Sequence, residues 1–250
     1  MTLIVGHRGA RNLWPENSLS GFRNLTALPV EAVEFDVHLS DAGELLVIHD
    51  PTLERTTDRT GPVRALPAGE RGSVVLKGSE GEGIPTLEDV LEVFKDVSIE
   101  LHVEIKSDVD HVPYLGLEAR AAAALAAAGV SDRAFLTSFD PQVLRTVRRV
   151  APHIRTLISF HRPSAERRGL AAGLEEAKEV AEIIAVEKSL LAAEWEAITN
   201  LVPRERLAVW TPNTEEELTY WLGKGLRDVT TDRPDIALAA REKIDALAEG

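Results

Sequence analysis

The chain has 250 residues, with 28 Lys and Arg against 41 Asp and Glu, and a formal net charge of −13. Such an acidic surface repels phosphates, which disfavours general binding to nucleic acids or anionic membranes. The chain has no cysteine, which excludes a disulfide scaffold, a cysteine nucleophile and a thiolate metal site. Hydrophobic residues make up 44% of the sequence, enough for a large core.

The hydropathy of the chain and its N-terminus bear on location. No stretch approaches 18 consecutive apolar residues, so we expect no membrane-spanning segment. The first ten residues, MTLIVGHRGA, lack the basic region and long apolar run of a secretory signal. We therefore expect a cytoplasmic protein.

Short apolar runs rich in Val, Ile and Phe alternate along the chain with segments of helical spacing. This alternation is typical of parallel strands joined by helical crossovers. The eight expected strands are Leu3–Gly9, Ala32–His38, Ile99–Lys106, Arg133–Phe139, His153–Phe160, Glu182–Glu187, Arg206–Thr211 and Asp228–Asp232. The expected helices are Glu16–Leu28, Leu87–Asp96, Tyr114–Ala128, Pro141–Val150, Leu174–Ala181, Ala192–Leu201, Glu215–Gly223 and Pro234–Ala248. Eight units averaging about 31 residues predict an α/β fold, a single (β/α)8 TIM barrel over residues 1–250.

A doubly wound open sheet is the rival architecture. Such a sheet usually has fewer strands and carries a G-x-G-x-x-G loop after the first strand. Here the first strand ends in His7-Arg8-Gly9-Ala10 instead. This difference favours the barrel.

Residues 39–85 interrupt the rhythm between the second strand and its helix. Ser40–Gly43 is typical of a hairpin turn, and Glu44–Ile48 of a return strand. The following insertion, residues 51–85, is rich in Gly, Thr, Arg and Pro. Loops after barrel strands lie on the C-terminal face, where barrel active sites are built, so we expect a lid or a substrate wall here.

Two carboxylates are expected on one face of the second strand. Residues i and i+2 of a strand point to the same side, so Glu34 and Asp36 project together. They repel each other unless a cation lies between them or one is protonated. Mg²⁺ or Ca²⁺ suits oxygen ligands. A solvated strand edge or a salt bridge is the commoner explanation for an isolated Glu-x-Asp.

The third strand changes that balance. It alternates polar and apolar residues, and its polar members His102, Glu104 and Lys106 are expected to point into the barrel. Barrel interiors are normally filled with branched apolar side chains. A divalent cation held by Glu104 and the two carboxylates of the second strand explains the exception, with Lys106 facing an anionic ligand. The alternative is a buried Glu–Lys pair, which is costly.

Two histidines are expected beside these carboxylates. His7 and Arg8 end the first strand, and Arg8 suits bidentate binding of a phosphate, although a lone His-Arg is more often part of a capped turn. Positions paired across the predicted hairpin sum to about 84, which returns His49 to the level of residues 34–36. Imidazoles on two sides of a metal-bound phosphate form a general base and a general acid.

Other polar and aromatic residues have weaker patterns. His38 continues the face of Glu34 and Asp36, and we expect it to support the site rather than ligate. Trp210 ends the seventh strand and is expected either in the substrate wall or in the core or rim. Surface or structural positions are expected for His111, His153 and His161, and a solvated loop for Arg55, Asp58 and Arg59.

Taken together, these motifs resemble the glycerophosphodiester phosphodiesterase family. The matching pieces are His7–Ala10, Pro15–Ser18, Glu34–Val37, Val47–Thr57, Ile84–Val90, Val103–Lys106, Val209–Thr211 with Asn213, and Thr231–Asp235. Each piece alone is weak, but the ordered set is specific and spans nearly the whole chain.

The resemblance implies a phosphodiester hydrolase on a (β/α)8 barrel that needs one divalent cation, Mg²⁺ or Ca²⁺. Its products would be glycerol 3-phosphate and an alcohol such as choline or ethanolamine, and its partner would be a small glycerophosphodiester, without nucleic acid or stable membrane insertion. By position, the resemblance implies metal ligands Glu34, Asp36 and Glu104, an acid–base pair His7 and His49, phosphate-neutralising Arg8 and Lys106, a supporting Glu16, and Trp210 at the glycerol end. It leaves open the alcohol, the attacking group and the oligomeric state.

One departure concerns the substrate. The segment of residues 62–83 is short and polar, whereas this family often has a longer, more aromatic cover there. This departure leaves the identity of the alcohol group undetermined, but it does not affect the expected reaction. A lysophospholipase D-like barrel is the nearest alternative, and the weakly apolar insertion argues against a lipid-facing mouth. A non-catalytic metal- and phosphate-binding barrel does not explain two histidines, and a sugar hydrolase with paired carboxylates does not explain Arg8 or Lys106.

Overall fold

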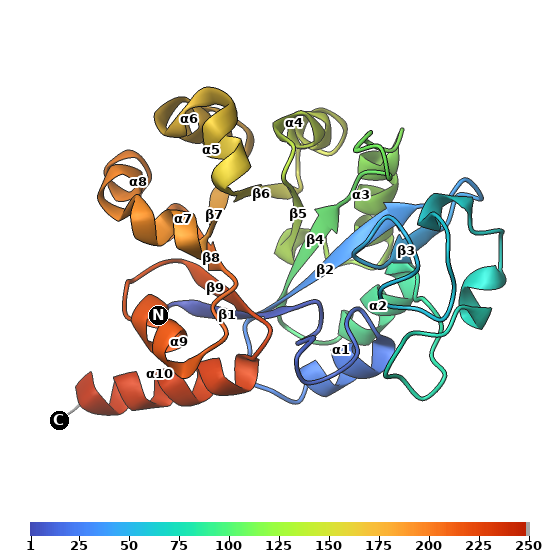
Figure 1. Cartoon of the computed structure of the whole chain (residues 1–250), viewed down its shortest axis with the longest axis horizontal. Helices are drawn as coiled ribbons and strands as arrows, with labels where there is room; N and C mark the ends of the chain where they lie inside the picture. Colours follow the sequence, from blue (N-terminus) through green and yellow to red (C-terminus); the bar gives the residue numbers. More distant parts are fainter. Residues whose placement is uncertain (249–250) are drawn as a thin grey trace.

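The computed structural model describes residues 1–248 and shows a closed barrel of parallel strands ringed by helices (Figure 1). The barrel strands are β1 (Leu3–His7), β2 (Ala32–Leu39), β4 (Glu100–Ile105), β5 (Ala134–Ser138), β6 (Arg155–Phe160), β7 (Ile183–Glu187), β8 (Leu207–Trp210) and β9 (Asp228–Thr231). β1 pairs with both β9 and β2, which closes the barrel. The predicted (β/α)8 fold is confirmed, with all eight expected strands.

The helices cover the outside of the barrel. They are α1 (Leu19–Leu25), α2 (Leu87–Phe94), α3 (Leu117–Ala127), α4 (Pro141–Val150), α5 (Arg162–Arg168), α6 (Leu170–Val180), α7 (Lys188–Ala193), α8 (Trp195–Leu201), α9 (Glu215–Leu222) and α10 (Pro234–Ala248), with 3-10 turns η1 (Val63–Ala65), η2 (Glu70–Ser73), η3 (Ser131–Arg133) and η4 (Arg204–Arg206). Within residues 1–248, no helix is long and apolar enough to cross a membrane.

The structure corrects three helix predictions. α5 and α7 were not expected, because α5 is mostly exposed and polar and α7 has six residues, too few to show a helical period. The predicted Glu16–Leu28 helix is shorter, since Ser18 caps α1 by accepting the Gly21 N–H, and the preceding Asn17 has a φ of 54°. The residues before Ser18 form a turn that reaches toward the barrel mouth.

Local sequence explains where several helices begin. Thr86 and Asp89 form a capping box at α2, and Thr214 and Glu217 form one at α9. Proline is favoured in the first turn of a helix because its missing N–H has no intrahelical partner there. Pro141 occupies this place in α4, behind the Asp140 cap.

The main core lies between the strands and the helices. Phe22 of α1 packs edge-to-face on Phe35 of β2 and on Phe94 of α2, with ring centroids 5.6 and 5.7 Å apart. Such aromatic contacts add to the free energy gained by burial. A smaller apolar cluster fills the barrel interior and consists of Phe135, Leu157, Ile183, Ala185 and Ala208.

The insertion after β2 lies beside the barrel (Figure 1). β3 (Leu45–Val47) runs antiparallel to β2, with Val37 opposite Val47 and Leu39 opposite Leu45. The expected hairpin register is therefore confirmed. The hairpin and the insertion together bury a small apolar core, formed by Leu46, Ile48, Leu53, Val63, Leu66, Val74, Leu76 and Ile84. This core gives the segment a fixed shape beside the site.

Candidate active site

The barrel register places the predicted carboxylates together. His7 of β1 lies opposite Glu34 of β2, and Asp36 of β2 lies opposite Glu104 of β4. Carboxylate oxygens of Glu34, Asp36 and Glu104 all lie within 4.8 Å of one another. All three side chains are largely buried. The i, i+2 alternation of two neighbouring strands therefore produces the cluster that the sequence indicated.

This cluster fits a hard divalent cation. Burial, together with the charges of Asp36 and Glu104, raises the pKa of Glu34 well above its usual value. Among the residues that the structure describes, no group donates a hydrogen bond to the buried Oδ1 of Asp36, although Lys106 Nζ lies 3.2 Å away. Three crowded carboxylates with an unsatisfied oxygen are the donor set that Mg²⁺ or Ca²⁺ prefers.

Two cationic side chains flank the cluster. Lys106 Nζ donates to Glu104 at 2.7 Å, and Arg8 Nε lies 3.4 Å from Asp36 Oδ2. Burial opposes ionisation of Asp36, but Lys106 and Arg8 hold its pKa well below the usual value. Asn17 Nδ2 also donates to Asp36 Oδ2 at 2.9 Å. The buried site thus keeps anions and cations in contact, a setting in which a phosphate gains strong interactions.

Backbone strain shapes the loop after β1. Arg8, Gly9 and Ala10 have φ values of 51°, 73° and 67°. Non-glycine residues rarely adopt this left-handed conformation, and it concentrates at functional sites. The turn directs the Arg8 N–H to Glu34 Oε2 at 3.2 Å. The loop therefore presents both the backbone and the guanidinium of Arg8 to the cluster.

His7 is held by a carboxylate from the last strand. Its Nδ1 lies 2.5 Å from Asp232 Oδ1, just after β9. Arg11 Nε donates to the same oxygen at 2.8 Å, and Asn213 Nδ2 donates to Oδ2 at 2.8 Å. Although burial disfavours the charged form of Asp232, hydrogen bonds from His7 and Arg11 hold its pKa well below the usual value. Burial lowers the pKa of His7.

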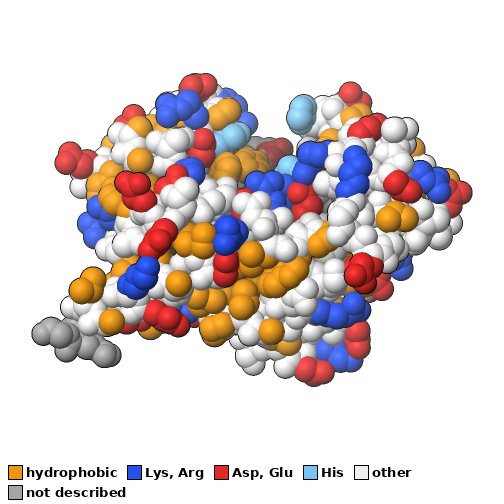
Figure 2. Space-filling model, turned by 60° about the horizontal axis from the view of Figure 1, so that its bottom comes forward, with side chains coloured by type: hydrophobic (Ala, Val, Ile, Leu, Met, Phe, Trp, Pro, Cys, Tyr) orange, Lys and Arg blue, Asp and Glu red, His pale blue; other side chains and the backbone are white. Residues whose placement is uncertain are grey.

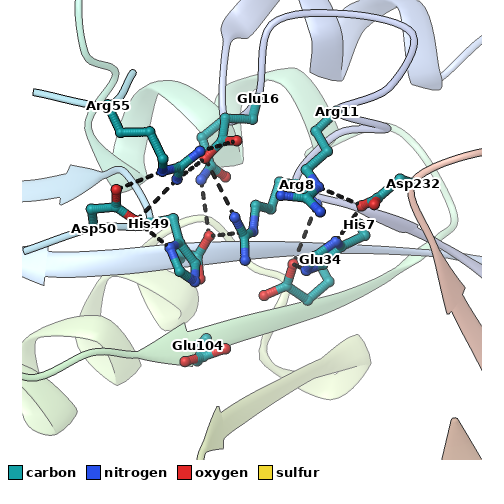
Figure 3. A network of polar contacts seen from close by, with 12 residues as sticks. His7, Arg8, Arg11, Glu16, Glu34, His49, Asp50, Arg55, Glu104 and Asp232 are labelled. Carbon is teal, nitrogen blue, oxygen red and sulfur yellow. Dashed lines mark hydrogen bonds and ion pairs between the residues drawn. The ribbon is translucent and has the colours of Figure 1, made fainter. Parts of the chain in front are cut away.

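His49 has a similar partner in its own neighbour. Its Nδ1 lies 2.6 Å from Asp50 Oδ1, and Arg55 Nε donates to Asp50 Oδ2 at 2.6 Å. Burial raises the pKa of Asp50, but hydrogen bonds from Arg55 and His49 prevail and lower it to about 2. Arg55 also donates to both oxygens of Glu16, at 2.8 and 2.7 Å. Figure 3 shows the two histidine–aspartate pairs on either side of Arg8.

Several members of this network were not predicted. Arg55 was expected in a solvated loop, yet it joins Glu16 to Asp50. Asp232 was predicted only as the last residue of the eighth strand, although its place at the C-terminal end of a barrel strand was a usable signal. For Asp50, which follows His49 directly in the sequence, no function was predicted.

The site opens into two adjoining cavities. One of about 270 Å³ is lined by both histidines, Arg8, Glu34 and Trp210, and a larger one of about 590 Å³ lies beside it. His49, Glu104 and Phe139 line both. In Figure 2, histidine and basic side chains line a hollow between two raised parts of the surface. A ligand at the shared boundary therefore reaches both cavities.

Trp210 lies in the cavity wall, one of the two expected positions. Its Nε1–H donates to Ala185 O at 3.0 Å, and its ring packs edge-to-face on Phe139 with centroids 5.5 Å apart. His153 is exposed, as expected. His111 is exposed and His161 packs on Phe139, which agrees with the expected surface or structural positions, and both also line the larger cavity.

Fold and site together define a class of protein, a (β/α)8-barrel enzyme whose cleft on the C-terminal face is lined by histidine, arginine and buried carboxylate side chains. Residues 7–236 match the model of the "Glycerophosphoryl diester phosphodiesterase family". The chain belongs to this family, and it is a phosphodiester hydrolase.

Similar proteins agree with this assignment. A glycerophosphodiester phosphodiesterase of Caldanaerobacter subterraneus is 30% identical over 244 residues, which cover 94% of this chain and 95% of that protein. A crystal structure from Agrobacterium tumefaciens, described as a candidate glycerophosphoryl diester phosphodiesterase, aligns with a TM-score of 0.90 and 26% identity over 98% of this chain and 99% of that one. A phosphodiesterase of Oleispira antarctica, solved with its product sn-glycerol-3-phosphate, shares the fold with a TM-score of 0.77 and 24% identity over 97% of both chains.

Proposed function

We propose that the enzyme hydrolyses glycerophosphodiesters to glycerol 3-phosphate and an alcohol with the help of one divalent cation. One observation carries the proposal: His7 and His49, each with a carboxylate on Nδ1, line the same cavity as Glu34 and Glu104. A binding protein needs cations for a phosphate, but it does not need two oriented imidazoles.

Glu34, Asp36 and Glu104 are the residues that would hold the cation. When bound, a divalent ion would stabilise the negative charge that develops on the phosphoryl oxygens in the transition state. Arg8 lines the smaller cavity and Lys106 the larger one, so both add fixed positive charge beside the carboxylates, where charge grows as the diester is attacked. Their ion pairs with Asp36 and Glu104 position both groups before the substrate arrives.

The histidines transfer the protons. A carboxylate only accepts hydrogen bonds, so His7 and His49 each direct Nδ1–H to an aspartate and leave Nε2 for the reaction. One Nε2 removes a proton from the attacking hydroxyl, while the other ring, protonated, donates one to the leaving alkoxide. Each step contributes roughly 10²–10⁴-fold to the rate. Asp232 and Asp50 orient the rings and stabilise their protonated forms.

The two cavities support a proposed position for each end of the substrate. With phosphate at the shared boundary near His49 and Glu104, the glycerol end lies in the 270 Å³ cavity against Trp210. The alcohol lies in the 590 Å³ cavity, which is larger than choline or ethanolamine requires. Glu16 acts from outside, by holding Arg55 and Arg8.

A second candidate substrate has one observation in its favour. The loop after β4 supplies His111 and Pro113 to the larger cavity and exposes apolar side chains, with Leu115 98% and Val112 55% exposed. Exposed apolar groups beside an active site favour contact with an amphiphile. Lysophospholipids, the substrates of lysophospholipase D, are therefore the alternative.

A substrate panel tests the proposal. The enzyme is treated with a chelator and then assayed with Mg²⁺ or Ca²⁺ on glycerophosphocholine, glycerophosphoethanolamine and lysophosphatidylcholine. We expect release of glycerol 3-phosphate from the first two, loss of activity after chelation and recovery with a cation. Preferred cleavage of the lysophospholipid would favour the alternative, and full activity in chelator would contradict the cation requirement.

A further inference from the structure

His38 is a buried histidine that the proposed reaction does not use. It lies on β2, on the face that also carries Glu34 and Asp36, and its side chain is fully buried. Its Nδ1 lies 2.8 Å from the hydroxyl of Tyr114, and its Nε2 lies 3.0 Å from the backbone carbonyl of His49. Both ring nitrogens are therefore paired, and one partner belongs to a proposed acid–base residue.

The chemistry of these partners sets the direction of each hydrogen bond. A carbonyl oxygen only accepts, so Nε2 of His38 carries a hydrogen and donates it to His49 O. In the neutral ring Nδ1 then has a free lone pair, which accepts the hydroxyl hydrogen of Tyr114. The hydrogen bonds run in one direction, from Tyr114 through His38 to the backbone of His49. Loss of the tyrosine hydroxyl would leave Nδ1 of the buried His38 ring without its hydrogen-bond donor.

The carbonyl of His49 lies beyond the regular strand pairing. The last backbone contact between β2 and the return strand joins Ile48 N–H to Asp36 O at 3.2 Å. Beyond Ile48, the backbone of His49 is held by the side chain of His38 and not by pairing with β2. The hydrogen bond from His38 fixes the plane of the peptide between His49 and Asp50, and that plane joins the two residues whose side chains make the 2.6 Å contact.

Tyr114 is itself held in place. It ends a loop in which Asp108 Oδ1 accepts the N–H groups of Asp110 and Val112. Arg64 of the insertion donates to Asp108 Oδ2 at 2.8 Å and to Asp41 at 2.9 Å. The loop, the hairpin turn and the insertion thus form one connected unit, and the Tyr114 hydroxyl has a defined position.

We infer that His38 is a positioning residue that holds His49 in its reactive orientation, and that Tyr114 holds the His38 ring in place through Nδ1. The inference rests on the proposed function, since it concerns the orientation of a proposed acid–base group. A displacement of a reacting group by about 1 Å can reduce the rate about 10²-fold. The loss of this hydrogen bond therefore acts on turnover more than on substrate binding.

Two amide substitutions separate orientation from general packing. In His38→Gln the amide nitrogen reaches the position of Nε2 and still donates to His49 O, whereas in His38→Asn it stops near the position of Nδ1. We expect His38→Asn to lower kcat about 10- to 100-fold with KM changed less than about 2-fold, and His38→Gln to stay within about 3-fold of wild type. Tyr114→Phe should lower kcat about 3- to 10-fold and add nothing to His38→Asn, because both act through one connection.

Stability and cation affinity are measured for every variant, with His153→Asn on the exposed surface as a matched control. Retained melting temperature and cation affinity, with the Asn and Gln variants differing in kcat, support the inference. Equal losses of kcat in both variants, or full activity in His38→Asn, overturn it while leaving the proposed function intact. A wild-type enzyme that cleaves no phosphodiester overturns the proposed function and the inference with it.

Discussion

Nδ1 of His7 lies 2.5 Å from Oδ1 of Asp232, although 225 residues separate the two in the chain. Pairing of β1 with β9 brings them together, so the contact exists only in the closed barrel. His49 has the same relationship with Asp50 through direct adjacency, at 2.6 Å. Barrel closure supplies one carboxylate and the neighbouring residue supplies the other, and in the proposed mechanism each leaves the Nε2 of its imidazole free to exchange protons.

Replacing Asp232 tests the first of these pairs. In Asp232→Asn the amide can donate to Nδ1, which favours the tautomer with hydrogen on Nε2 and removes the stabilising charge. We expect kcat to fall roughly 10²-fold or more, within the range of a single acid–base group, with cation affinity unchanged. Steady-state kinetics of Asp235→Asn, whose carboxylate pairs with Arg233 away from the histidines, provides the control. Equal activity of both variants would contradict the role of Asp232.

Arg55 should control the pH range in which Asp50 is ionised. Hydrogen bonds from Arg55 and His49 lower the pKa of Asp50 to about 2 against the effect of burial, so Asp50 stays charged above that pH. In Arg55→Met the pKa of Asp50 rises, because one of the groups that lowers it is lost. On acidification, Asp50 of the variant is therefore protonated at a higher pH than in the wild type. We expect the acidic limb of kcat/KM to move upward in pH, with little change near pH 8.

The pH–rate profile of Arg59→Met is the matched comparison, since Arg59 lies in the same insertion and bonds Ser73 instead. Superimposable profiles for wild type and Arg55→Met would show that Arg55 does not act on the site. The lowered pKa of Asp50 also affects the free energy of unfolding. Ionised Asp50 stabilises the folded protein at a pH above the pKa that this carboxyl has in the unfolded chain, and this contribution is lost as the pH falls through its pKa in the folded protein.

A separate network of charged side chains stabilises the N-terminal end of the barrel, where β4 and β9 begin. Arg227 donates to Glu100 at 2.6 Å and to the fully buried Asp228 at 2.7 Å. Arg227→Met leaves both carboxylates without this partner, which should lower the free energy of unfolding by about 3–5 kcal/mol. Arg233→Met, which breaks a more exposed pair, should cost about 1 kcal/mol or less.

Urea unfolding measures both values, and kcat/KM of the folded Arg227→Met enzyme should match wild type. An Arg227→Met protein as stable as Arg233→Met would contradict the importance of the buried network. A large loss of kcat/KM in fully folded protein would connect this end of the barrel to the reaction.

The sequence predicts those parts of the site that depend on regular geometry. Alternation along β2 and β4 is enough to bring Glu34, Asp36 and Glu104 to one side, and a hairpin of fixed register is enough to return His49. Asp232 escapes this reasoning because its contact depends on closure between the first and last strands. Arg55 escapes it because the irregular insertion has no period from which a side-chain direction follows.

We propose that Glu34, Asp36 and Glu104 hold a cation between His7 and His49. Calorimetric titration of Mg²⁺ and Ca²⁺ into wild type, Glu104→Gln, His7→Ala and His49→Ala, with turnover measured on the same samples, tests it most directly. We expect Glu104→Gln to lose cation affinity and turnover together, and each histidine variant to bind the cation while turnover falls roughly 10²–10⁴-fold. Unchanged cation affinity in Glu104→Gln, or unaltered turnover in both histidine variants, would contradict it.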